Sequence, residues 1–267
     1  MISSISIEVS SRCDVEKVSR VYSELGVELV FVTWRPDAAI RQFCNTCVKL
    51  TEAGVGVVPH IVARNLNSRS ELQQLLKQFN KCSGINSLML LGGDALNAAG
   101  PYCSAIDLLA DENIQSAGIS KIFVAGYPKG HALISDQTLD ASLLQKVSST
   151  RLLNFGLEIV AQLCPSMADA VNWASETKAR HDTEVRISVP LGNKNIIERR
   201  LTQIYQHPIE VKNLNNHDPQ ALAFLGSALK NLQAENIQAK LHLIPFHNMD
   251  SLLSYTNEIN TMIKSEL

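Results

Sequence analysis

Short apolar runs alternate along the chain with segments in which apolar residues recur every three or four positions. Eight runs have the length and composition of buried strands: residues 4–9, 28–33, 54–63, 87–91, 121–125, 157–162, 184–189 and 241–244. Helical spacing separates them over residues 14–25, 38–52, 68–79, 102–111, 139–147, 166–180, 195–205, 219–234 and 252–264. This alternation, without a linker-like break, predicts an α/β fold in which a single (β/α)8 TIM barrel domain occupies residues 1–267.

Length and composition agree with this expectation. A barrel of this kind typically has about 250 residues, and the chain has 267. Only 19% of the residues are charged and the formal net charge is −2, which argues against nucleic-acid or membrane-surface partners. No apolar run is long enough to span a membrane, and the N-terminus lacks the pattern of a signal peptide. We therefore expect a cytoplasmic protein.

The six cysteines show no spacing that repeats as a disulfide or metal framework would. Cys44 and Cys47 have the CxxC form, but they fall inside a predicted helix rather than at a helix start after a strand. We therefore expect neither a redox pair nor a metal site.

The most informative stretch is residues 84–94, because a strand there runs directly into a glycine-rich loop. Leu91 ends the apolar run, and Gly92, Gly93 and Asp94 follow at once. Two residues without Cβ atoms would let a flat ligand approach the backbone, with the Asp94 carboxylate beside it. The alternative is a plain turn in which Asp94 caps the next element.

In a (β/α)8 barrel, chemistry collects at the carboxyl ends of the strands. Polar residues lie at or near four further strand ends: Thr33, His60, Tyr127 with His131, and Gln162. Glu8 lies within the first strand, where a buried carboxylate is costly unless it has a partner or a task. The alternatives are a Glu8 side chain that points outward at the barrel rim, and histidines that are satisfied by backbone groups.

These residues carry a resemblance to the methylenetetrahydrofolate reductase family, the flavin-dependent barrel enzymes of one-carbon metabolism. The matching segments are Val58–His60, the loop at Gly92–Asp94, Val124–His131 and Ala161–Gln162. The sequence AGYPKGH, at residues 125–131, is the most specific, because it is close to the family's GYPEGH. The similarity extends from about residue 4 to residue 190 and more weakly to the last strand.

The resemblance implies a reaction and a set of catalytic residues. Glu8 matches the glutamate that protonates folate N10 and opens the five-membered ring, and Asp94 matches an aspartate near the flavin and the pterin. Gln162 matches a glutamine that hydrogen-bonds the folate, and its amide can both donate and accept. Glu8 can hold a proton if its surroundings raise its pKa, while an ionised Asp94 stabilises the cationic iminium.

The resemblance also implies FAD as the cofactor and NAD(P)H as the co-substrate. In such a site the cofactor performs the hydride chemistry, and the protein orients it. The implied cofactor-binding residues are Thr33, His60, Leu91, Gly92, Gly93, Asp94, Ala125, Tyr127, His131 and Asp140.

Several segments depart from the family pattern. The family's FEFFPP is replaced by Ile5–Ser11, which has no proline, and the arginine of the RGD-type loop is Gly92. Trp34–Asp37 stands where the family has a glycine-rich turn, and Arg35 offers a positive charge there. The aromatic FFFD run is Leu163–Ser166, which removes a stacking surface.

The function implied is interconversion of 5,10-methylenetetrahydrofolate and 5-methyltetrahydrofolate, in the reducing direction or in the methyl-oxidising direction after a demethylation. The expected partner is a folate, and a homo-oligomer is left open. Two alternatives remain: a catalytically altered homologue that binds folate or flavin as a regulatory or partner protein, and a barrel enzyme acting on another pterin-linked one-carbon unit.

Overall fold

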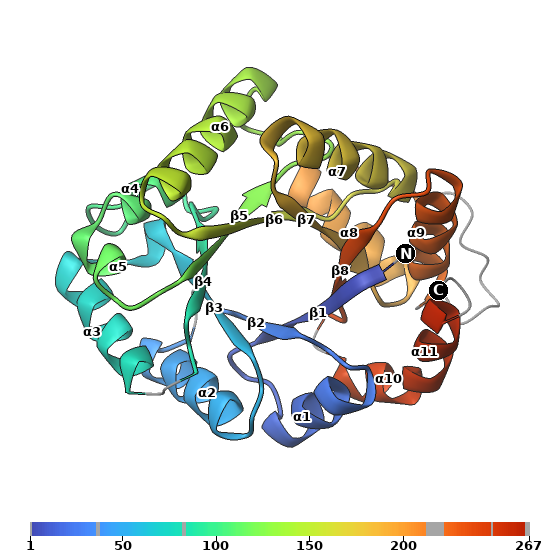
Figure 1. Cartoon of the computed structure of the whole chain (residues 1–267), viewed down its shortest axis with the longest axis horizontal. Coiled ribbons are helices and arrows are strands. Elements are labelled where there is room, and N and C mark those ends of the chain that lie inside the picture. The colour runs from blue at the N-terminus through green and yellow to red at the C-terminus, as the bar shows by residue number, and fades with distance from the viewer. Residues whose placement is uncertain (1, 36–37, 82–83, 212–221, 247, 265–267) are drawn as a thin grey trace.

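The computed structural model describes residues 2–35, 38–81, 84–211, 222–246 and 248–264. Eight parallel strands pair in chain order, and β8 pairs with β1 to close a barrel (Figure 1). The strands are β1 (Ile2–Ser10), β2 (Leu29–Thr33), β3 (Val57–Val62), β4 (Ser87–Leu91), β5 (Lys121–Gly126), β6 (Gly156–Ala161), β7 (Glu184–Pro190) and β8 (Ala239–Ile244). The (β/α)8 barrel predicted from the sequence is confirmed.

Helices follow the strands and surround them. They are α1 (Val15–Glu24), α2 (Ile40–Glu52), the 3-10 helix η1 (Ala63–Asn65), α3 (Arg69–Asn80), α4 (Ala105–Leu109), α5 (Glu112–Gln115), α6 (Asp136–Leu152), α7 (Met167–His181), α8 (Lys194–Tyr205), α9 (Ala223–Ala234), α10 (Met249–Ser254) and α11 (Thr256–Lys264). The CxxC cysteines lie inside α2, as expected.

Three helix predictions were wrong in their extent. Of the helix expected over residues 102–111, only Ala105–Leu109 is helical, and a second short helix begins at Glu112, where the Asp111 side chain caps it by accepting from Asn113 N. The helix expected over 139–147 begins earlier, where Ser135 caps it, and runs to Leu152. The last predicted helix is divided into α10 and α11. Residues 219–221, expected to begin a helix, lie outside the described residues.

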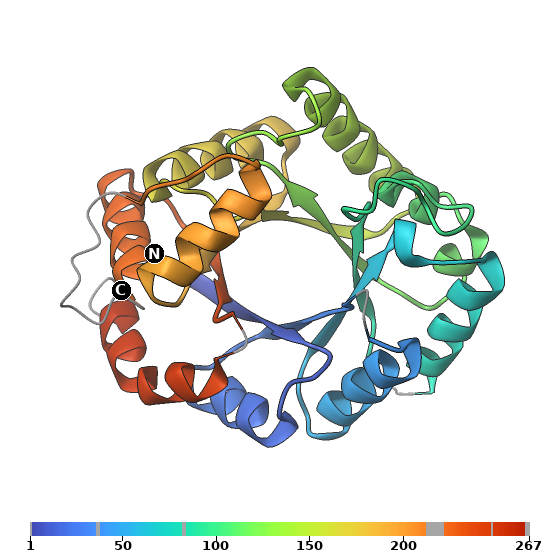
Figure 2. The same cartoon turned by 180° about the vertical axis from the view of Figure 1, so that it is seen from behind.

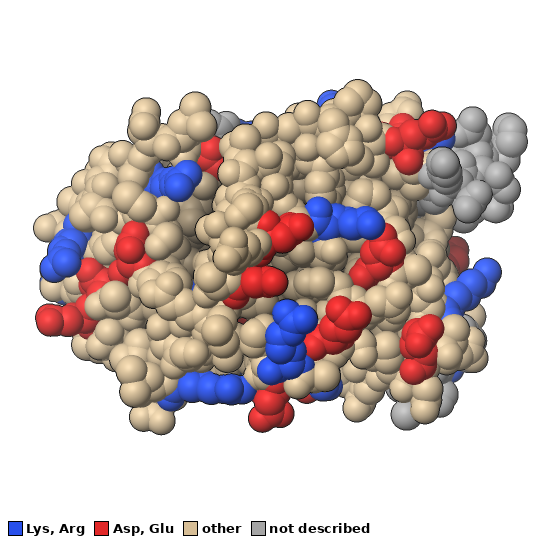
Figure 3. Space-filling model, turned by 90° about the horizontal axis from the view of Figure 1, so that it is seen from above, with Lys and Arg blue, Asp and Glu red and all other residues tan. Residues whose placement is uncertain are grey.

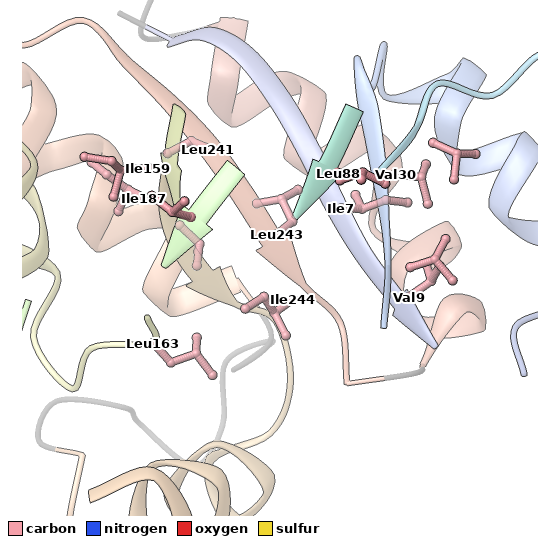
Figure 4. Packing of buried hydrophobic residues seen from close by; sticks show 14 of the residues in the cluster. Ile7, Val9, Val30, Leu88, Ile159, Leu163, Ile187, Leu241, Leu243 and Ile244 are labelled. Atoms are coloured by element: carbon pink, nitrogen blue, oxygen red, sulfur yellow. The ribbon is translucent and has the colours of Figure 1, made fainter. Parts of the chain in front are cut away.

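Side chains on each strand alternate between the helices and the barrel interior. The outward-facing residues of β1, Ile5, Ile7 and Val9, belong to the large core between the strands and the helices. Figure 4 shows Ile7 and Val9 in this layer with apolar side chains of other strands and of the loop after β6. Strands covered by helices bury apolar side chains on this face. The strands could therefore be recognised in the sequence as short apolar runs.

The barrel interior has two unlike halves. Five apolar side chains from consecutive strands pack together inside it: Phe31, Val58, Met89, Phe123 and Val160. Opposite them, the inward positions of β1, β7 and β8 are polar, including Ser6, Ser188 and His242, which are all buried. The site described below lies at the carboxyl end of this divided interior.

Charged side chains fill the amino-terminal end of the barrel. Arg186 of β7 is fully buried and donates to Glu158 (2.7 Å) and Glu28 (2.8 Å). Glu158 also pairs with Lys121 and, at 2.6 Å, with Lys240. This cluster, called the basal ion cluster below, closes the end of the barrel away from the candidate site.

Helix α8 departs from the regular pattern. In Figure 2, α8 crosses one side of the barrel opening, while α9 takes the place in the outer ring, where it packs against α7 and β7. Tyr205 at the end of α8 donates to the carbonyl of Leu163 beyond β6 (2.8 Å). Among the helices of the described residues, none has the combination of length and apolar character that crossing a bilayer requires.

Candidate functional site

The expected site residues of β1 to β6 lie at the carboxyl ends of those strands. Most are partly accessible: Glu8, Thr33, Leu91, Gly92, Gly93, Ala125, Tyr127, His131 and Gln162 are intermediate in burial, Asp94 is exposed and His60 is buried. The corresponding residues of β7 and β8, Pro190 and Ile244, are buried, on the side that α8 crosses. The opening is therefore accessible over β1 to β6.

Glu8 points into the barrel rather than outward at its rim. Its Oε2 atom lies 3.7 Å from Nε2 of His242 on β8, and its side chain is 27% exposed. The inward face of β1 is polar from end to end, because Ser4, Ser6 and Ser10 alternate with the outward apolar residues. The apolar residues of β1 therefore lie on the outward face of the strand, and Glu8 shares the inward face with serines.

His242 connects Glu8 to a buried serine. Its Nδ1 atom lies 2.9 Å from Oγ of Ser6, and that hydroxyl also reaches the carbonyl of Leu241 (3.2 Å). If Ser6 donates its single proton to this carbonyl, it must accept from His242 Nδ1, and Nε2 then turns a lone pair toward Glu8.

His242 and Ser6 were not predicted as site residues from the sequence. The sequence nevertheless contained an indication for His242, namely a polar residue inside an apolar strand. His242 lies between two leucines, just as Glu8 lies between two aliphatic residues. Only the closed barrel shows that β8 is the neighbour of β1 and that these side chains meet.

His60 lies deeper in the interior. Its ring packs edge to face against Phe31, with centroids 5.9 Å apart, and the ring of His242 lies on the same phenylalanine at 4.7 Å. Its Nε2 atom is buried and has no hydrogen-bond partner within the described structure. Burial lowers the pKa of His60 to about 4, with a further lowering from His242 and an opposing effect of Glu8. His60 is therefore neutral at pH 7, and it is not the backbone-satisfied histidine considered as the alternative.

The loop after β4 has the shape expected of its glycines. Gly93 has φ +95°, and a Cβ atom there would lie 2.5 Å from Cγ1 of Val62. At Gly92 a Cβ atom would have no neighbour closer than 4.0 Å. Gly93 is thus required by the backbone, whereas Gly92 leaves open space where the family pattern has an arginine.

Arg64, which follows β3, holds this loop in place. Its guanidinium group donates to the carbonyls of Ala95 (2.8 Å) and Cys103 (3.0 Å), and its backbone N–H donates to the carbonyl of Gly92 (3.0 Å). Asp94 is exposed in the loop so held. No side-chain cap by Asp94 accompanies α4, which is capped by Ser104 instead.

Ala125 and the loop after β5 lie next to Asp94. The rings of Tyr127 and His131 are perpendicular, with centroids 5.6 Å apart. Burial raises the pKa of Tyr127, and the negative charge of Asp94 raises it further. Lys129, in the AGYPKGH segment, pairs with Asp169 at the start of α7 (2.7 Å).

The remaining predicted residues are placed by local contacts. Thr33 donates to the carbonyl of Val9 (3.2 Å), and the Gln162 side chain accepts from Leu163 N (3.0 Å). Asp140 is exposed on α6, and its charge acts on His181 of α7.

No group of three His, Cys, Asp or Glu side chains is arranged as metal ligands in the part of the chain that the structure describes. Of the CxxC pair, burial raises the pKa of the Cys44 thiol to about 11.

The fold and the site define a (β/α)8-barrel protein with a carboxylate, two buried histidines and a glycine-rich loop at the carboxyl end of its strands. The family model of methylenetetrahydrofolate reductase matches residues 11–150, which are more than half of the 267 residues. The chain belongs to the methylenetetrahydrofolate reductase family.

Solved structures share the architecture at low sequence identity. An uncharacterized protein from Clostridium thermocellum that binds two copies of 5-methyl-5,6,7,8-tetrahydrofolic acid is similar with a TM-score of 0.58 and 6% identity, over 97% of this chain and 95% of that one. Dihydropteroate synthases are also similar with TM-scores of 0.51: that of Yersinia pestis (8% identity; 98% and 93% covered) and that of Thermus thermophilus (12%; 97% and 93%). At these identities the likeness establishes the fold.

Proposed function

We propose that the protein interconverts 5,10-methylenetetrahydrofolate and 5-methyltetrahydrofolate with FAD as cofactor and a nicotinamide nucleotide as electron partner. Membership in the family indicates a folate-related function. The observation that carries the specific proposal is Glu8, an inward carboxylate at the open end of the barrel, beside His242.

Glu8 acts as the acid in this proposal. Opening the five-membered ring of the folate requires a proton on the leaving nitrogen, and a general acid must itself carry that proton at working pH. His242 lies 3.7 Å from Glu8, and its other ring nitrogen lies 2.9 Å from the hydroxyl of Ser6. We therefore assign His242 and Ser6 the role of positioning the side chain of the acid.

Asp94 supplies a negative charge on the far side of the same opening. It is exposed in the loop after β4. Two carboxylates in contrasting surroundings can hold different protonation states, which the acid and the charge-stabilising group require. Gln162, partly accessible at the end of β6, is the proposed hydrogen-bonding group for the amide edge of the pterin.

We propose that residues at the opening hold the planar end of a flavin. Thr33 at the end of β2, and Ala125 and Tyr127 at the end of β5, are partly accessible, and Nε2 of the buried His60 has no partner within the described structure. A buried polar atom without a partner is costly, so a ligand that reached His60 would relieve that cost. Leu91, Gly92, Gly93 and His131 complete the proposed set, and Asp140 would meet only an extended arm of the cofactor. When bound, the flavin supplies hydride transfer.

The first experiment is the absorption spectrum of the purified protein, followed by identification of any extracted ligand. We expect flavin absorption that bleaches on addition of NADH or NADPH, together with oxidation of the nicotinamide by methylenetetrahydrofolate.

The second experiment is Glu8→Gln. We expect the variant to keep flavin and nicotinamide-driven bleaching but to lose folate turnover by about 100-fold or more, because a positioned acid contributes on that scale. Glu16→Gln, an exposed change in the first turn of α1, is the matched control and should be fully active. Normal folate turnover by Glu8→Gln would contradict the assignment of the acid.

Gly92 favours one alternative, because the loop lacks the arginine that the family pattern has there. A catalytically altered folate-binding homologue would be colourless and yet bind 5-methyltetrahydrofolate. Calorimetric titration of flavin-free protein with that folate distinguishes this function from the main proposal, and it would also detect a barrel enzyme acting on another pterin-linked unit.

A further inference from the structure

The ring of Trp173 on α7 packs directly against Gly126, the last residue of β5. A Cβ atom at Gly126 would overlap the Trp173 ring and would lie 2.8 Å from Cγ2 of Ile159 on β6. Because position 126 has no side chain, α7 and β6 can close on the end of β5. The carbonyl of Gly126 in turn accepts from the backbone N–H of Gln162 (2.7 Å). Packing at Gly126 therefore affects Gln162 as well as Tyr127, the residue that follows Gly126.

An ion pair holds the loop after β5 to the same helix. Asp169 lies one helical turn before Trp173, so the two side chains share one face of α7. Asp169 pairs with Lys129 (2.7 Å). Lys129 lies in a turn that the backbone N–H of Gly130 closes by donating to the carbonyl of Tyr127 (3.2 Å). Helix α7 therefore holds the chain on both sides of Tyr127.

The residue at position 129 distinguishes this chain from the family pattern. The family's GYPEGH has a glutamate where this chain has Lys129, and a glutamate there would repel Asp169. Figure 3 views the molecule from the side of α6 and α7, and acidic and basic side chains are interspersed on that face. The lysine and the aspartate thus form a local pair on a surface of mixed charge.

We propose that Trp173 and Asp169 are positioning residues for the flavin, because they fix the segment that carries Tyr127. The inference rests on the proposed function, in which Tyr127 contacts the flavin. Trp173 and Asp169 act on binding through the position of Tyr127, from the helix layer outside the strand. The loop after β5 is thus set by α7 as well as by its own strand.

Hydrogen exchange in the ligand-free protein tests whether α7 holds the loop. Asp169→Asn removes the ion pair, and Trp173→Leu removes the ring. In both variants we expect the amides of Gly130 and Gln162 to exchange at least about threefold faster than in the wild type, since their hydrogen bonds lie in the segment that α7 holds. Asp169→Asn keeps the test decisive if Trp173→Leu fails to fold, because the Asp169 side chain is 41% exposed.

A second ion pair of α7 supplies the matched control. Lys178, in the last turn, pairs with Glu184 at the opposite end of the barrel (2.8 Å). The side chains of that pair are 42% and 41% exposed, against 51% and 41% for Lys129 and Asp169. Glu184→Gln should therefore leave the exchange of the Gly130 amide, and the affinity for flavin, as they are in the wild type.

Titration with FAD and with riboflavin tests the effect on binding. We expect Asp169→Asn to weaken the binding of both by about threefold to fivefold, which is the scale of a half-exposed ion pair. Its thermal midpoint should stay within about 3 °C of the wild type. Lys129→Glu should weaken binding at least as much, and the double change Lys129→Glu, Asp169→Lys should restore it because the pair is re-formed in reverse.

The two flavins distinguish positioning from direct contact. Riboflavin has no phosphate, so a loss confined to FAD would indicate a phosphate contact of Lys129 and would overturn the proposal. Unchanged exchange in Asp169→Asn and Trp173→Leu would also overturn it, as would an equal loss of affinity in Glu184→Gln. A wild-type chain that binds neither flavin would overturn the proposed function instead, and the exchange rates would then still decide whether α7 holds the loop.

Discussion

His60 shows how the surroundings of one side chain decide its chemistry. Histidine ordinarily titrates between pH 6 and 7, but His60 is enclosed by β3 and by the ring of Phe31. Burial lowers its pKa to about 4. Nε2 of the neutral ring has no hydrogen-bond partner within the described structure, so His60 carries an unsatisfied polar atom and no charge at pH 7.

This environment predicts a dependence of stability on pH. Between pH 6.5 and about 4 the unfolded chain binds a proton at His60 that the folded chain does not, so stability falls as the pH falls through this range, by up to about 3 kcal/mol. His60→Phe should remove this component and should be as stable as the wild type at pH 7. Urea unfolding at a series of pH values measures both quantities.

Val58→Ala, on the same strand and fully buried inside the barrel, is the control. It should lower the free energy of unfolding at every pH by about 1–3 kcal/mol without changing the pH dependence. An unchanged acid dependence in His60→Phe would show that other groups cause it.

At the scale of elements, the loop after β4 is built from two glycines with different tasks. Gly93 has a left-handed φ and lies against Val62, whereas Gly92 has free space around it. Arg64 fixes the loop by binding two of its carbonyls. The position of Asp94 therefore depends on β3 as well as on the strand that precedes it.

Gly93→Ala should destabilise the protein by about 1–3 kcal/mol, because a Cβ atom would meet Val62 in a conformation that alanine rarely adopts. Gly92→Ala is the matched change and should remain within about 0.5 kcal/mol of the wild type. Chemical unfolding measures both. Equal losses in the two variants would contradict the different tasks assigned to the two glycines.

At the scale of the whole molecule, the basal ion cluster connects strands that are distant in sequence. Arg186 of β7 bonds Glu158 of β6, Glu28 just before β2 and Ser4 of β1. Burial opposes ionisation of Glu158, but Arg186 and the two lysines lower its pKa overall. Glu158 thus stays charged and holds three cations at one end of the barrel.

Glu158→Gln should cost more stability than Glu28→Gln. The Glu158 side chain is 3% exposed and the Glu28 side chain 48%, so the first change leaves buried cations uncompensated while water screens the second. We expect about 3–5 kcal/mol for Glu158→Gln and about 1 kcal/mol or less for Glu28→Gln. Thermal or urea unfolding at pH 7 tests this order, and a reversed order would refute it.

The placement of the candidate residues was predictable in part. Glu8 and Asp94 stood out because a carboxylate in an apolar strand and one after two glycines are both unusual. The contact between Ser6 and His242 was not predictable, because the two residues are 236 positions apart. The end of α4 before residue 111 and the start of α5 after it depended on the side-chain cap of Asp111, which periodicity does not reveal.

By itself, the sequence determined the alternation of eight strands with helices, and with it the barrel, because apolar periodicity is a local property and parallel strands covered by helices admit few arrangements. The tertiary structure decided which side chains meet. Closing β8 onto β1 brought His242 to Glu8, and the basal ion cluster formed where the other ends of the strands converge. Such contacts depend on the register between strands, and no single segment of the chain encodes that register.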